Sequence, residues 1–149
     1  MKRMITAIVV SLLTTVPVLA SDQSDIVAVL NQWNDADDAK AVAACGDDAS
    51  VIDDVPPFEW HGPGACSKWA KDYEAFLQKE GMTDVSGTIG KPRQLTITGD
   101  HAFAVAPTTF AYTKNGKPVK VSATATFSLH KTAAGWRITG WAWTPLTTS

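Results

Sequence analysis

The chain of 149 residues has few residues of the types that build metal sites, with only two cysteines and three histidines. They form no standard four-ligand zinc motif, and no serine lies in a nucleophile motif of the hydrolase type. Basic residues do not dominate either, because 13 Lys and Arg are opposed by 15 Asp and Glu and the net charge is −2. Nucleic acid requires a cationic surface, so it is not an expected partner. We expect neither a metal nor a cofactor.

What is present is the composition of a single folded domain. Apolar residues make up 45% of the chain and charged residues 19%, as in ordinary globular proteins. No linker rich in Gly, Ser or Pro and no internal repeat divides the sequence. Helical signals come first and extended signals follow, which is typical of an α+β domain.

Residues 1–20 have the pattern of a secretory signal peptide. A cationic segment over 1–4 precedes a mostly apolar run, and small or β-branched residues occupy positions −3 and −1 before Ser21. Polar residues interrupt the run, which is shorter than the roughly 20 apolar residues of a membrane-spanning helix. We therefore expect cleavage before Ser21, a periplasmic or secreted domain over 21–149, and no membrane attachment after cleavage.

Export favours a disulfide between Cys45 and Cys66, because an oxidising compartment lets paired thiols persist as a bond. Closing a loop of this length would stabilise the fold by about 3 kcal/mol. Two inert thiols are an alternative. A reactive Cys66 is another, since it lies in the first turn of an expected helix with His61 close in sequence, and both features lower a thiol pKa.

The first half of the domain is expected to hold two helices. Ser24 can cap the first of them, which presents one stripe at helical spacing formed by Ile26, Leu30, Trp33 and Asp37. A short second helix is expected over 39–45, with an aspartate as its cap and Gly46 as its end.

Two short strands and a third helix follow. Strands are expected over 49–53 and 58–61, with a turn at Pro56-Pro57 between them. The third helix opens after Gly62-Pro63-Gly64 and stops at Gly81. Its apolar stripe consists of Ala65, Trp69, Tyr73, Phe76 and Leu77.

The remainder predicts four antiparallel strands that follow one another, over 85–98, 101–113, 118–131 and 136–145. Turn sequences separate them, and Asn115-Gly116 is a strong hairpin signal. The strand over 118–131 alternates an apolar face with a Ser/Thr face. In the last strand the tryptophans change parity around Gly140, so either a bulge re-aims the side chains or both faces are covered.

Four local patterns carry a family resemblance. They are Trp33 followed by Asp37-Asp38, the run over 47–53, Trp60-His61-Gly62 before the third helix, and the terminal Gly135-Trp136-Arg137-Ile138. With the order of elements, they make residues 21–149 resemble the nuclear transport factor 2-like superfamily, which includes the SnoaL-like and ketosteroid isomerase-like domains.

The resemblance implies an α+β cone with about three N-terminal helices packed on a curved, mixed or antiparallel sheet of about six strands. It also implies a cavity between the helices and the concave face of the sheet. The superfamily contains isomerases, dehydratases, hydrolases and cyclases as well as domains that only dimerise, so the fold leaves the function open.

Aromatic residues are the candidates for the cavity wall, since small-molecule sites are mostly apolar. The predicted ligand-binding residues are Trp33, Asp37, Trp60, Tyr73, Tyr112 and Trp143, with Phe110 as a further aromatic candidate. For the aromatic residues, plain packing in the core is the alternative. For Asp37 the alternative to a place at the cavity mouth is capping of the second helix.

Asp53 is the first candidate for catalysis, with His61 as its partner. Alternation places Asp53 on the same face as Val51, and burial of a carboxyl raises its pKa into the range of a useful acid or base. His61 would carry a proton or donate a hydrogen bond to an oxyanion. The alternatives are a solvated Asp53-Asp54 turn and a His61 that caps backbone groups.

Other charged groups are interpreted as surface features. His130 is expected to be exposed or at an interface, and the lysines at the Asn115-Gly116 hairpin favour solubility. An acidic set lacks the spacing of a calcium loop and is interpreted as a solvated edge: Asp35, Asp37, Asp38, Asp47 and Asp48.

Three functions follow from these patterns. The first is an exported SnoaL-like protein that binds a small apolar molecule in its cavity. The second is a lyase, isomerase or hydrolase that needs no cofactor and uses Asp53 and His61. The third is a protein-interaction module with a filled cone, in which extra aromatic surface is buried by association. A homodimer is expected.

Overall fold

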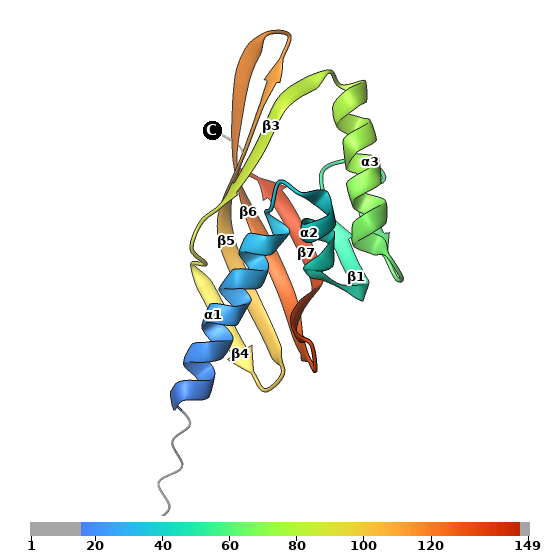
Figure 1. Cartoon of the computed structure of the whole chain (residues 1–149). Coiled ribbons are helices and arrows are strands. Elements are labelled where there is room, and N and C mark those ends of the chain that lie inside the picture. Colours follow the sequence, from blue (N-terminus) through green and yellow to red (C-terminus); the bar gives the residue numbers. More distant parts are fainter. Residues whose placement is uncertain (1–15, 147–149) are drawn as a thin grey trace, which may run out of the picture.

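The computed structural model describes residues 16–146 and has three helices and one mixed sheet of seven strands (Figure 1). The helices are α1 (Val16–Trp33), α2 (Asp38–Ala43) and α3 (Ala65–Lys79). The strands are β1 (Cys45–Ile52), β2 (Glu59–His61), β3 (Met82–Ile89), β4 (Gln94–Thr98), β5 (His101–Lys114), β6 (Lys117–Thr132) and β7 (Gly135–Pro145). The predicted α+β class is confirmed, with seven strands in place of about six.

The sheet has the order β2-β1-β7-β6-β5-β3, and β4 also pairs with β5. The β1–β7 pair is parallel and the other pairs are antiparallel. Helices α1 and α2 lie across one face of the sheet and α3 flanks it, while the β5–β6 hairpin extends beyond the helices (Figure 1). The helices therefore face the concave side of the sheet.

The single strand predicted over 85–98 is wrong, because the chain leaves the edge of β5 and then returns to it. Strand β3 ends with Ile89 opposite Thr108, and β4 begins with Gln94 opposite Val105. Pro92 lies in the intervening loop and has no N–H to donate to a strand partner. The strand therefore breaks into two pieces that pair with different halves of β5.

The first two helices differ from the prediction at their ends. Ser24 does not cap α1 but lies within it, and its Oγ donates to the Ser21 carbonyl at 2.8 Å. Helix α2 ends at Ala43, and Cys45 already belongs to β1, so Gly46 does not end the helix. The cap of α2 is an aspartate as predicted, namely Asp37.

Residues 1–15 of the predicted signal peptide lie outside the described residues, and Val16 to Ala20 form the first turns of α1. Among residues 16–146, no helix is long and apolar enough to cross a membrane. Close to the predicted cleavage point, buried Asp22 accepts hydrogen bonds from Lys131 Nζ at 2.5 Å and Trp136 Nε1 at 3.0 Å. These contacts join α1 to the β6–β7 hairpin.

A bulge at Thr139 explains the change of parity in β7. Leu129 lies opposite Ile138 and Ser128 lies opposite Gly140, so Thr139 is an extra residue between the two pairs. Because of this residue, Ile138 and Trp141 are both buried although one position is even and the other odd. The bulge alternative is confirmed.

The core lies between the helices and the concave face of the sheet. Phe127 and Leu129 of β6 are buried with Ile26 and Leu30 of α1, while Ser128 on the opposite face is exposed. The predicted alternation in this strand is therefore confirmed, and its Ser/Thr residues lie on the outer face.

A disulfide joins Cys45 at the start of β1 to Cys66 in the first turn of α3, as predicted. Neither cysteine is free, so the alternatives of inert thiols and of a reactive Cys66 are wrong. The sequence separation is 21 residues, and closing this loop stabilises the fold by about 3 kcal/mol. The bond fixes α3 against β1, next to the cavity described below.

Candidate functional site

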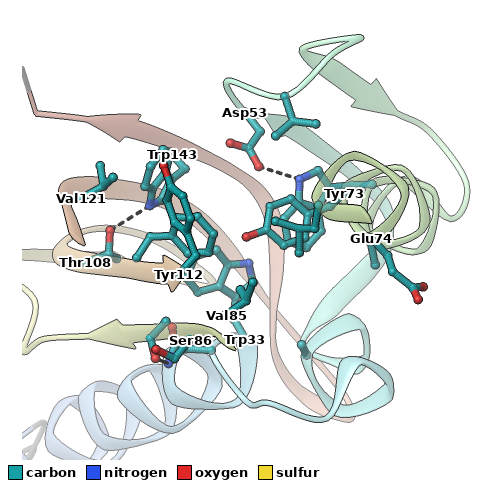
Figure 2. A pocket seen from close by; sticks show the side chains of 18 of the residues that line it. Trp33, Asp53, Tyr73, Glu74, Val85, Ser86, Thr108, Tyr112, Val121 and Trp143 are labelled. Atoms are coloured by element: carbon teal, nitrogen blue, oxygen red, sulfur yellow. Dashed lines mark hydrogen bonds between the residues drawn. The ribbon is translucent and has the colours of Figure 1, made fainter. Parts of the chain in front are cut away.

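A cavity of about 660 Å³ lies between α1, α2, α3 and the concave face of the sheet (Figure 2). This volume is in the range of sites that bind small molecules. Eight of its 28 lining residues are aromatic, and the rings include Trp33, Trp69, Tyr73, Tyr112, Trp141 and Trp143. The cone is therefore hollow, and the prediction of a filled cone is wrong.

The rings on one side of the cavity hold one another in place. The Trp33 ring meets Phe127 edge to face with a centroid separation of 4.9 Å, and it meets Trp141 in the same manner at 5.2 Å. The Trp69 ring packs edge to face on Trp141 at 4.7 Å and stacks on Tyr73 at 5.1 Å. Such pairs add about 0.5–1.5 kcal/mol each beyond their burial, so this wall is pre-formed.

The opposite side is built from the ends of β5 and β7. Phe110 lies 5.2 Å from Tyr112 and 6.4 Å from Trp143 between ring centroids. The Trp143 indole is held by a hydrogen bond from Nε1 to Thr108 Oγ1 at 3.0 Å (Figure 2). Thr108 lies on β5 and Trp143 on β7, with β6 between them, so the hydrogen bond that orients this ring spans the central strand of the three.

Asp53 follows β1 directly and brings a buried carboxyl to the cavity. It is 7% exposed, and its Oδ2 accepts a hydrogen bond from Trp69 Nε1 at 2.7 Å (Figure 2). Its Oδ1 accepts from the Asp54 backbone N–H at 2.8 Å. Burial raises the pKa of Asp53 to about 6, although both hydrogen bonds act to lower it. A carboxyl with this pKa can accept or donate a proton near neutral pH.

Tyr73 presents its hydroxyl to the same cavity (Figure 2). Burial raises the pKa of this phenol, and the negative charges of Asp53, Asp54 and Asp38 raise it further. The hydroxyl therefore stays protonated and serves as a neutral donor or acceptor.

Two indole N–H groups in the cavity wall have no acceptor among the described residues. They belong to Trp33 and Trp141, and both nitrogens are buried. A buried donor without a partner costs about 1–3 kcal/mol. Two of the rings that line the cavity therefore carry a cost in stability.

The structure brings most of the predicted site residues together. Trp33, Asp53, Tyr73, Tyr112 and Trp143 all line the cavity.

Three of the predicted site residues require correction, because they do not line the cavity. Trp60 is 5% exposed and packs in the core, with Nε1 donating to Asp72 Oδ2 at 2.8 Å. His61 is the next residue of β2, so its side chain takes the opposite parity and is exposed, and it is not a partner of Asp53. Asp37 caps α2 by accepting from Ala39 N at 3.0 Å.

Sequence reasoning did not select Trp69 and Trp141 as cavity residues. Trp69 was placed in the apolar stripe of the third helix, and its spacing of four residues from Tyr73 was the available signal. The bulge obscured the orientation of Trp141, because strict alternation gives opposite faces to Ile138 and Trp141.

Within residues 16–146, one group of side chains offers ligand atoms that could hold a metal ion, and this group lies outside the cavity. Asp100 Oδ1 is 2.7 Å from His101 Nδ1, and Asp100 Oδ2 is 3.1 Å from His130 Nε2. Hydrogen bonds with His130 and His101 lower the pKa of Asp100. The three side chains therefore already satisfy one another without an ion. His130 is half-buried beside this pair.

The fold is that of the nuclear transport factor 2-like proteins. A nuclear transport factor 2-like protein with a cystatin-like fold from Novosphingobium aromaticivorans has a TM-score of 0.70 at 18% identity, covering 88% of this chain and 86% of the other. A superfamily protein from Salmonella enterica gives 0.69 at 16% identity, over 88% and 95%. A ketosteroid isomerase-like protein from Erwinia carotovora gives 0.62 at 20% identity, over 89% and 99%.

No model of a protein family matches the chain, and no curated protein is similar to it in sequence. At these identities the structural likeness establishes the fold alone. The function must be argued from the cavity and its side chains.

Proposed function

We propose that this protein is exported and binds a small, largely apolar molecule in its cavity. The observation that carries the proposal is the cavity of about 660 Å³ with its pre-formed aromatic wall. A wall of interlocked rings around an open volume favours ligand binding, because no side-chain rearrangement has to precede entry. Export is supported by the signal-like residues 1–20 and by the disulfide, which persists in an oxidising compartment.

The experiment is a thermal-unfolding screen against small apolar compounds. A ligand at one hundred times its dissociation constant stabilises the folded state by about 2.7 kcal/mol, which raises the Tm by about 8 °C. A Val121→Trp variant, which fills the cavity from β6, should lose this shift. The matched control is Ser122→Trp, because Ser122 is exposed on the opposite face of the same strand. Equal shifts in both variants would contradict binding in the cavity.

A second candidate function is a cofactor-independent lyase, isomerase or hydrolase. Asp53 favours it, because this buried carboxyl lines the cavity and has a pKa of about 6. His61 has no catalytic role in this proposal, because its side chain does not line the cavity. Once a substrate is found, Asp53→Asn should abolish turnover while the variant still binds the substrate, and unchanged turnover would exclude the acid–base role.

The expected homodimer stays a prediction that sedimentation can test. Ile52 and Phe103 are large apolar residues that remain exposed at 58% and 40%. Association through the sheet would cover them, so we expect a dimer at micromolar concentration. A monomer at that concentration would refute it.

A further inference from the structure

The charged residues around the cavity are all acidic. Among the described residues that line it, five are carboxylates and none is Lys, Arg or His: Asp35, Asp38, Asp53, Asp54 and Glu74. Asp53 is buried and the other four are exposed, so one negative charge lies within the cavity and the rest lie toward its mouth. The Glu74 carboxylate is turned away from the centre (Figure 2).

Little positive charge offsets these groups. Among the salt bridges of residues 16–146, one involves a lining carboxylate, with Lys40 Nζ 3.8 Å from Asp35 Oδ2. Both side chains of that pair are well exposed, so solvent screens it. Lys114 and Lys131 are paired elsewhere, with Glu80 and Asp22. Asp38, Asp53 and Asp54 form no salt bridge with any residue of 16–146.

The charges act on the interior of the cavity and not only on its rim. Tyr73 lies in the aromatic wall, and Asp53, Asp54 and Asp38 each raise the pKa of its hydroxyl in addition to burial. A negative potential that disfavours a phenolate at this point disfavours any anion there and favours a cation.

The aromatic wall has the same preference. The faces of indole and phenol rings carry partial negative charge, and a cation within about 6 Å of a ring centroid is attracted to it. The rings of Trp33, Trp69 and Trp141 lie within 5.2 Å of a neighbouring ring and form one side of the cavity. They would accept the apolar body of a ligand as well as an ammonium group attached to it.

We infer that the cavity selects organic cations, namely molecules with an apolar, ring-sized body that carry an ammonium group. The inference rests on the proposed ligand-binding function and names its ligand class. The apolar body packs against the indole rings, and the ammonium group lies toward Asp53, Asp54 and Asp38. Neutral analogues bind less tightly and anionic analogues least.

The test is isothermal titration calorimetry with three probes that share one ring system. They are 2-naphthylmethylammonium, 2-naphthalenemethanol and 2-naphthoate, measured with the full chain at pH 7.5 and low salt. We expect the ammonium to bind at least tenfold more tightly than the alcohol, and the naphthoate to bind most weakly. Since the preference is electrostatic, 0.5 M salt should reduce the ratio of the two affinities.

Two double variants with the same change in net charge locate the effect. Asp38→Asn with Asp54→Asn removes two lining carboxylates, and we expect the ratio of ammonium to alcohol affinity to fall at least threefold. Asp48→Asn with Glu59→Gln removes two exposed carboxylates outside the cavity, and the ratio should stay unchanged. An equal fall in both variants would overturn the inference, because net charge alone would then explain the preference.

The three probes also separate the two proposals. If the alcohol binds as tightly as the ammonium, the cation inference is overturned while ligand binding in the cavity stands. If the naphthoate binds most tightly, the cation inference is likewise overturned. If no probe binds and no compound of the thermal screen raises the Tm, the proposed function fails and the inference fails with it.

Discussion

Replacing Asp53 by Asn should change how the stability of the protein depends on pH. Asp53 is buried in the cavity wall, where its pKa is raised to about 6 by burial against the opposing hydrogen bonds from Trp69 and Asp54. The groups near it that can carry charge are the Asp54 carboxylate and the Tyr73 phenol, and the latter stays neutral. Asn at this position removes the ionisation, but its amide nitrogen cannot accept one of the two hydrogen bonds that the carboxyl oxygens accept from Trp69 and Asp54, which adds a cost in stability that does not change with pH.

The sign and size of the effect follow from proton linkage. The pKa is near 3.8 when the residue is exposed and about 6 in the folded protein. Between these values the folded protein holds a proton that the unfolded chain has lost, so protonated Asp53 contributes stability that is fully present below pH 3.8. That contribution is lost as the pH rises through about 6, and two pKa units amount to about 3 kcal/mol.

We therefore expect the free energy of unfolding of Asp53→Asn, relative to that of the wild type, to rise by about 3 kcal/mol from pH 4 to pH 8. Urea denaturation followed by tryptophan fluorescence, at steps of one pH unit and without reductant, measures this difference. Asp48→Asn, at an exposed position of β1, controls for the loss of one carboxylate. A difference that stays constant within about 0.5 kcal/mol from pH 4 to pH 8 would refute the reasoning.

Three further predictions concern the frame of the cavity. Replacing Cys45 and Cys66 together by Ser should lower the free energy of unfolding by about 3 kcal/mol, and an unchanged urea midpoint would contradict the role of the disulfide. Trp69→Phe removes the N–H that donates to Asp53 Oδ2, a hydrogen bond that lowers the pKa of Asp53. The pKa of Asp53, measured by ¹³C NMR titration of its carboxyl, should therefore rise above about 6, and a fall would contradict this role of the hydrogen bond. Gly140→Ala places a Cβ 3.0 Å from Ser128 Oγ and 3.3 Å from the Ser50 carbonyl oxygen. This crowding should lower the free energy of unfolding, measured by urea denaturation, by about 1–3 kcal/mol. A variant as stable as the wild type would show that the bulge tolerates a side chain.

The sequence predicted those parts of the fold in which a periodic pattern extends over many residues. The alternation in β6 and the helical stripe that contains Trp69 and Tyr73 each repeat often enough to identify the buried face. The sequence also predicted correctly that Asp53 lies on the same face as Val51. The strand alternates, its inward face is apolar, and both residues are buried. Export and the site roles of these residues remain predictions.

The parts that could not be predicted are short or irregular. Strand β2 has three residues, so the pattern cannot show that Trp60 points into the core while His61 is exposed. The break of the predicted strand over 85–98 depends on how β3 and β4 share the edge of β5, which is a long-range pairing with no local signal beyond Pro92. The sequence allows two roles for Asp37, and the hydrogen bond that it accepts from the Ala39 backbone N–H shows that it caps α2.

The contact of Asp22 with Lys131 and Trp136 sets a limit on how far the N-terminus can be trimmed. Cleavage before Ser21 would leave Asp22 as the second residue of the mature chain. An aminopeptidase that removed two residues would take away Asp22, which accepts the hydrogen bonds from Lys131 and Trp136. Trp136 is 2% exposed, so its indole N–H would then be buried without a partner. The processed chain is therefore expected to tolerate the loss of Ser21 but not of Asp22, and N-terminal sequencing after limited aminopeptidase digestion would show trimming pause at this residue.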